Sequence, residues 1–148
     1  MARRTFDDEV ISAYGIKYRR IQHLDYKYEL AEPYGYPYAI EIRPEASIDH
    51  PYMALTTDAK LTVKARYAWD GASGPARDTP NIMRGSLVHD ALYQMMRERL
   101  LDHERYREAA DRLLRNICRE DGMSGMRAWW VYWGVRVGGG CAARRRDA

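Results

Sequence analysis

The spacing of the apolar residues changes once along this chain, near Pro80, and this change limits the fold more than any other feature. Before Pro80, apolar and polar residues alternate in three runs, 26–30, 38–42 and 61–65, a pattern typical of half-buried strands. Turn-forming residues separate the runs. After Pro80 the apolar residues recur every three or four positions, which predicts amphipathic helices.

Helices are predicted over residues 83–99, 104–119 and 126–137. The pair Asp121-Gly122 predicts a left-handed cap that ends the second helix. The first two helices are joined by a short loop, so we expect them to lie antiparallel. The expected fold class is α+β: an N-terminal antiparallel β-sheet of four or five strands, then two antiparallel helices and a C-terminal aromatic helix.

The length of 148 residues predicts a single domain with one core. We divide it into a β-rich half (1–68), a loop plus helical half (69–137) and a flexible basic tail (138–148). Within the β-rich half, residues 5–14 are expected to form one short helix, with Thr5 as its N-cap.

Composition excludes several classes of protein. Apolar residues make up 46% of the chain and charged residues 30%, which argues against disorder. The two cysteines form neither a disulfide framework nor a zinc motif. The net charge of +3 gathers largely at the termini, so nucleic-acid binding is not expected. We expect no signal peptide and no transmembrane segment, because the N-terminus lacks an apolar run and no apolar stretch approaches ~20 residues.

A candidate site lies in the stretch WDGASGPARDTPNIMRGSLVHDALY, residues 69–93. On a helix, His89, Asp90 and Tyr93 fall within an arc of roughly 100°. That arc borders the apolar stripe, so His89 is expected to meet a neighbouring helix on one side and solvent on the other. Asp111 on the second helix could accept a hydrogen bond from one ring nitrogen, leaving the other free to act as a base.

The loop before this helix offers oxygen ligands for a hard cation. Asp70, Gly71 and Ser73 could contribute carboxylate and carbonyl oxygens, and Asp90 could reach back to them. Glycines allow the backbone turns that aim carbonyls inward. Calcium held there would polarise an ester carbonyl while His89 deprotonates water.

Three segments, YAWDGASGP, MRGSLVHDALYQ and EDGMSGMRAWWVYW, closely resemble a family of small phage and prophage proteins of unknown function. The resemblance covers residues 52–137. It implies a viral or prophage origin, and therefore a bacterial host cytoplasm or a virion as the location.

More distantly, the chain resembles phospholipase A2, especially the prokaryotic type. That family combines a glycine-containing calcium loop, a helical HDxxY and an Asp on the antiparallel helix. The resemblance implies a lipid substrate and a catalytic set of His89 as base, Asp111 as its orienting partner and Tyr93 bracing Asp111. It also implies calcium bound by Asp70 and Asp90 with the loop carbonyls.

Simpler interpretations stay open. His89 could be a structural histidine hydrogen-bonded across a helix pair. Asp90 could cap a loop amide or pair with one of the nearby arginines, for instance Arg84. The WDGASGP segment could be a tight turn after a strand, closed by Asp70.

The aromatic helix has three interpretations: a core helix packed on the sheet, a contact with a second copy or a phage structural protein, and interfacial membrane binding. The residues involved are Trp129, Trp130 and Trp133. Two functions follow: a phage-encoded, calcium-dependent ester hydrolase, or a non-enzymatic structural or accessory protein, such as a minor virion or tail component, that keeps the helix pair as scaffold.

Overall fold

The computed structural model describes residues 4–5, 9–72 and 78–139. They form an antiparallel β region followed by three helices, as the α+β prediction requires. The chain divides into two compact units, Met1–Gly71 and Ala72–Ala148, which are described separately. The predicted tail lies mostly outside the described residues.

The first unit contains two antiparallel sheets, whereas the sequence predicted one. The five-stranded sheet has the order β1-β3-β4-β9, with β2 also paired to β3. Its strands are β1 (Arg4–Thr5), β2 (Ile11–Ala13), β3 (Ile16–Gln22), β4 (Tyr28–Leu30) and β9 (Ala68–Trp69). The four-stranded sheet has the order β5-β8-β7-β6. Its strands are β5 (Tyr34–Gly35), β6 (Ile48–Asp49), β7 (Met53–Leu55) and β8 (Leu61–Val63).

The helix predicted over residues 5–14 is wrong. Thr5 lies in β1, and Ile11–Ala13 forms a hairpin with β3. The hairpin turn is Tyr14-Gly15, with φ of 50° and 91°, the pair of positive angles that a two-residue turn between twisted strands requires. Cross-strand hydrogen bonds outweigh helix formation here, because an isolated helix this short is marginal in water.

Residues 38–42 do not form the predicted strand. Ile40 and Ile42 are buried and Glu41 is exposed, as the alternation predicts, but Tyr38 is exposed. Ile40 donates one backbone hydrogen bond to Ala59 O, at 3.0 Å. Pro37 and Pro44 flank the run, and proline has no backbone N–H to donate to a neighbouring strand. This explains why residues 38–42 do not form a strand despite their alternating pattern.

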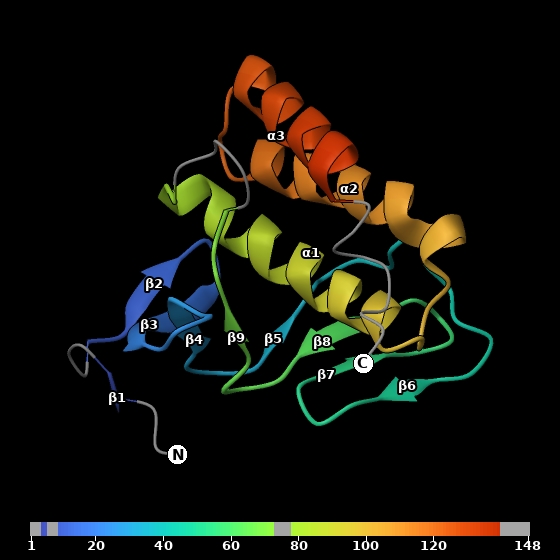
Figure 1. The fold of residues 1–148 in the computed structure, drawn as a ribbon, viewed down its shortest axis with the longest axis horizontal. Coiled ribbons are helices and arrows are strands. Elements are labelled where there is room, and N and C mark those ends of the chain that lie inside the picture. Colours follow the sequence, from blue (N-terminus) through green and yellow to red (C-terminus); the bar gives the residue numbers. More distant parts are fainter. Residues whose placement is uncertain (1–3, 6–8, 73–77, 140–148) are drawn as a thin grey trace. The chain divides into compact units, whose positions relative to one another are not determined.

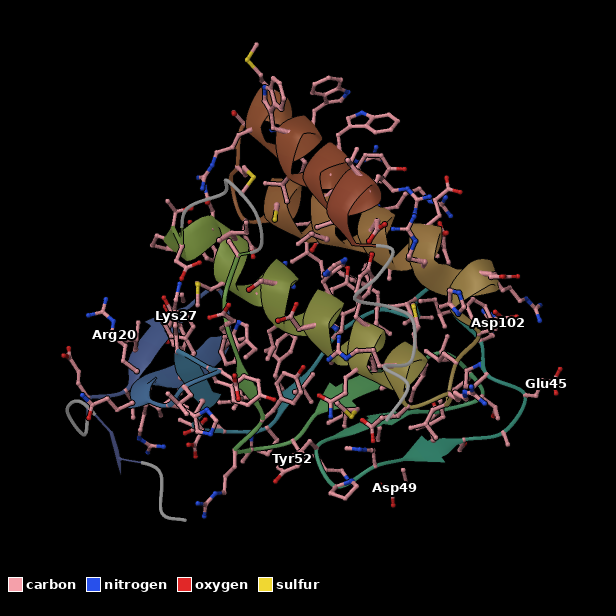
Figure 2. The ribbon with its side chains drawn as sticks, viewed as in Figure 1. Arg20, Lys27, Glu45, Asp49, Tyr52 and Asp102 are labelled. Atoms are coloured by element: carbon pink, nitrogen blue, oxygen red, sulfur yellow. The ribbon has the colours of Figure 1, made fainter. Side chains whose placement is uncertain are left out.

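The second unit contains α1 (Pro80–Arg97), α2 (His103–Glu120) and α3 (Gly125–Gly138), close to the predicted bounds. Asp102, seen at the beginning of α2 in Figure 2, accepts a hydrogen bond from Glu104 N and caps that helix. The end of α2 has the predicted left-handed cap at Gly122, whose φ is 88°. The amides of Gly122 and Met123 bond back to Arg119 O and Cys118 O, so the last carbonyls of α2 are satisfied.

Helix α2 packs against both α1 and α3 (Figure 1). Its end lies beside the beginning of α1, where Arg84 forms a two-pronged ion pair with Asp121 at 2.8 and 3.0 Å. Arg84 also contacts Glu120 at 2.8 Å.

Of the three interpretations of the aromatic helix, the core helix is wrong for the tryptophans. Ala128, Val131, Tyr132 and Val135 are buried, but Trp129, Trp130 and Trp133 are exposed. Within the described residues, no helix is both long and apolar enough to cross a membrane.

Gly85 permits the close approach of α1 and α2. A Cβ there would stand 3.0 Å from Leu114 Cδ1, 3.1 Å from Cys118 Sγ and 3.3 Å from the Leu114 carbonyl. Three crowded neighbours, one of them backbone, leave no room unless the helices separate.

We therefore expect Gly85→Ala to reduce the free energy of unfolding by about 1–3 kcal/mol, although alanine favours helices. Gly134→Ala is the matched control, since an added Cβ meets nothing within 4 Å. The free energy of unfolding of the control should rise by up to about 1 kcal/mol, because alanine favours helices more than glycine does. Urea unfolding of both variants tests this, and a Gly85→Ala variant as stable as the parent would contradict it.

Candidate functional site

Helix α1 carries His89, Asp90 and Tyr93 close to one another. His89 is 4% exposed, so the expectation that one side of its ring meets solvent is wrong. Asp90 is partly exposed, and Tyr93 is buried with its ring centroid 4.1 Å from that of His89. His89 and Tyr93 are one helical turn apart, so both side chains reach the same residue on α2.

That neighbour is Asp111. The Nε2 atom of His89 lies 2.7 Å from Asp111 Oδ1, and the Tyr93 hydroxyl donates to the same oxygen at 2.5 Å. A carboxylate only accepts hydrogen bonds, so we assign a proton to Nε2. In the neutral ring, the lone pair then resides on Nδ1.

The Nδ1 atom lies near Asp90, 3.8 Å from Oδ1 and beyond hydrogen-bonding distance. The two edges of the imidazole therefore differ. The Nε2 edge meets a fully buried carboxylate, whereas the Nδ1 edge lies near a carboxylate that is partly exposed.

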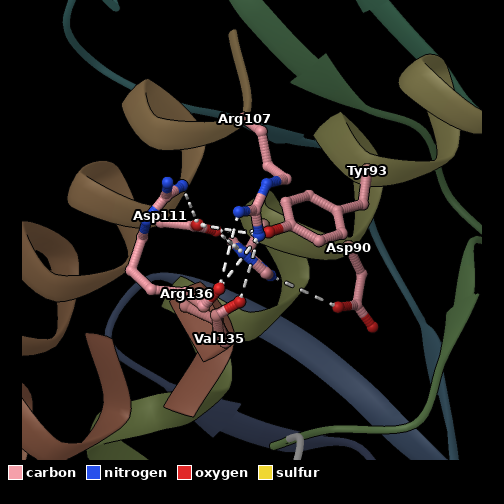
Figure 3. A network of polar contacts seen from close by, with 7 residues as sticks. Asp90, Tyr93, Arg107, Asp111, Val135 and Arg136 are labelled. Atoms are coloured by element: carbon pink, nitrogen blue, oxygen red, sulfur yellow. Dashed lines mark hydrogen bonds and ion pairs between the residues drawn. The ribbon is translucent and has the colours of Figure 1, made fainter. Parts of the chain in front are cut away.

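Two arginines that the sequence analysis did not identify complete the surroundings of Asp111 (Figure 3). Arg136 on α3 donates to Asp111 Oδ2 at 2.9 Å. Arg107 lies one turn before Asp111 with Nη1 3.9 Å from Oδ2, and it donates to the carbonyls of Val135 and Arg136. The i, i+4 spacing could have indicated Arg107. Nothing in the sequence pairs Arg136 with Asp111 across 25 positions.

The titration properties follow from burial and these contacts. Burial acts to raise the pKa of the Asp111 carboxyl, but the hydrogen bonds from His89 and Tyr93 outweigh it, and the pKa lies below its usual value. Burial acts to lower the pKa of His89, but the interactions with Asp111 and Asp90 leave it raised. The pKa of Tyr93 is raised, first by burial and then by the hydrogen bond to Asp111.

The predicted metal ligands are divided between the two units, so their convergence on one cation stays a prediction. Asp70 and Gly71 belong to the first unit and Asp90 to the second. Gly71 has a φ of 77°, the left-handed conformation that the loop was expected to need from glycine. Ser73 lies outside the described residues. Within the described part of the chain, no group of three or more His, Cys, Asp or Glu residues could hold a metal ion.

The segment that carries this network also identifies the family. Residues 46–135 match the model of a protein family described as of unknown function, DUF1353, and the chain belongs to that family. The match includes His89, Tyr93, Arg107 and Asp111 and ends one residue before Arg136. No curated protein and no solved structure matches the chain.

The lowered pKa of Asp111 predicts how stability depends on pH. A carboxyl with a lower pKa in the folded state stabilises the fold above its unfolded pKa, about 3.9, and loses this contribution as the pH falls through the folded value. Asp111→Asn should therefore lower the free energy of unfolding by about 3 kcal/mol at pH 7. The difference in this free energy between variant and parent should shrink below about pH 4.

Glu108→Gln is the matched control on the same helix. Glu108 pairs with Arg112 at 2.9 Å on the surface, so loss of this ion pair should lower the free energy of unfolding by less than about 1 kcal/mol. Urea unfolding between pH 2.5 and 8 measures both variants. Equal costs for the two variants at pH 7 would contradict the stabilising role of Asp111.

Proposed function

We propose that this protein hydrolyses esters, with His89 as the general base and Asp111 and Tyr93 as positioning residues. The observation that carries the proposal is the convergence of His89 Nε2 and Tyr93 Oη on one carboxylate oxygen, at 2.7 and 2.5 Å. This contact fixes the orientation and tautomer of the ring, which a histidine base needs.

The chemistry assigned to the chain is a proton transfer at Nδ1. Water gives a proton to Nδ1 as its oxygen attacks the ester carbonyl carbon, and the positive charge that develops on the ring is stabilised by Asp111. The tetrahedral intermediate then releases the alcohol, which takes the proton from Nδ1. Arg136, bound to the other oxygen of Asp111, helps to keep that carboxylate ionised and in place.

Calcium is part of this proposal, with Asp90 and the oxygens of Asp70, Gly71 and Ser73 as its ligands. The support is chemical: calcium prefers carboxylate and carbonyl oxygens, and Asp90 is an accessible carboxylate beside the Nδ1 edge. Bound calcium supplies positive charge for the oxygen of the ester carbonyl. By resemblance to phospholipase A2, the substrate class is a phospholipid or another envelope ester.

The test is release of fatty acid from mixed phospholipid vesicles in the presence of calcium. His89→Asn should lower the rate by roughly a hundredfold or more, because loss of a general base costs about that factor. Asp90→Asn should raise the calcium concentration needed for activity. Glu108→Gln, whose side chain pairs with Arg112 at the surface, should leave the rate unchanged.

Two results would contradict the proposal. If the parent protein releases no fatty acid, or if His89→Asn is as active as the parent, the base assignment is wrong. Activity that persists in a calcium chelator would contradict the calcium assignment alone.

A second candidate function is a phage structural or accessory protein in which the same network is scaffold. The burial of His89, at 4% exposure, favours this second function. So does the fact that both carboxylate oxygens of Asp111 already accept hydrogen bonds. Buried, fully bonded polar groups also occur where they only hold helices together. In that case His89→Asn lowers the unfolding temperature and the parent hydrolyses no ester.

A further inference from the structure

Helix α3 presents a second apolar face in addition to the one it buries. Its buried residues point one way, and the opposite arc of about 100° holds five large apolar side chains. These are Met126, Trp129, Trp130, Trp133 and Val137, called here the tryptophan face. Each is 46–85% exposed.

The tryptophan face is a continuous cluster. The ring of Trp129 contacts those of Trp130 and Trp133, with centroids 5.3 and 6.3 Å apart. Scattered exposed apolar residues are ordinary, but adjoining indoles on one helix face form a patch of the kind that binds a partner or a membrane. A helix that is apolar all round is normally covered on every side.

The sequence of the segment that contains this face indicates the chemistry of its partner. Between Gly122 and Arg146 the sequence has no acidic residue and five arginines, Arg127, Arg136, Arg144, Arg145 and Arg146. On the helix, Arg127 and Arg136 border the tryptophan face on opposite sides. A segment of this charge is attracted to anionic groups.

We propose that the tryptophan face of α3 docks on an anionic lipid surface. Indole rings favour the boundary between headgroups and acyl chains, where the apolar ring and the polar N–H are both accommodated. Arg127, on one border of the face, is suited to bind a lipid phosphate while its stem stays in apolar surroundings, whereas Arg136 binds Asp111. A second copy is a poorer partner, because it would bring the same arginines against these ones.

This surface goes beyond the proposed hydrolysis and does not require it. Docking depends on α3, whereas the base lies on α1. The two are connected through Arg136, since one helix carries both the tryptophan face and the arginine that binds Asp111.

The experiment is co-sedimentation of the full chain with vesicles of phosphatidylcholine alone or mixed with phosphatidylglycerol. Ether-linked lipids and a calcium chelator exclude hydrolysis. We expect binding to the anionic vesicles to be greater by on the order of tenfold or more, and to fall as salt is added. Tryptophan fluorescence should shift to the blue as the indoles enter the interface.

Replacing Trp129, Trp130 and Trp133 together with serine should abolish binding and the blue shift, with circular dichroism reporting the fold. Trp130→Ser alone, at the most exposed of the three, should weaken binding if the triple variant does not fold. The matched control replaces the exposed Tyr38 and Tyr52 with serine, and it should bind as the parent does.

The proposal is overturned if neither vesicle binds, or if both bind equally. It is also overturned if sedimentation equilibrium shows a dimer that the tryptophan replacements dissociate while vesicles bind nothing, because a second copy then covers the face. His89→Asn should bind vesicles like the parent, so loss of hydrolysis and loss of docking are separate outcomes.

Discussion

The arrangement of the helices depends on one buried carboxylate. Asp111 is fully buried, and a charge in that position is costly unless it is paired and hydrogen-bonded. The compensation comes from the neighbouring helices: His89 and Tyr93 from α1, and Arg136 from α3. Because the donors lie on both of the helices that pack against α2, satisfying this one group sets the positions of α1, α2 and α3 along one another.

Close packing makes those hydrogen bonds geometrically attainable. Gly85 lets α1 approach the backbone of α2 near Leu114, one turn of α1 before His89. Arg84 then ties the beginning of α1 to the end of α2 through Asp121. Without the short separation at Gly85, a histidine would not reach an aspartate on the next helix at 2.7 Å. The hydrogen bond between His89 and Asp111 therefore depends on the close packing at Gly85, a residue with no functional group of its own.

Helix α3 has two roles on two sides. Towards α2 it contributes Arg136, and its last carbonyls accept hydrogen bonds from Arg107, a favourable place for a cation because the C-terminal end of a helix carries partial negative charge. Away from α2 it exposes the tryptophan face. An event that moves or fixes α3 would thus act on the carboxylate that binds His89, which physically connects a surface to a buried histidine.

The sequence by itself determined the local features: the three helices, the cap at Gly122, the class α+β and the pairing of His89 with Asp111, because helical periodicity and spacing express them directly. Long-range pairing was decided by the tertiary structure. It divided the strands between two sheets and placed Ile11–Ala13 in a hairpin, since partners distant in sequence supply the hydrogen bonds of a strand. It also decided that Arg136 meets Asp111 and that Trp129, Trp130 and Trp133 face outward. Periodicity gives α3 two apolar faces, but only the packing of α2 against one of them selects which residues are buried.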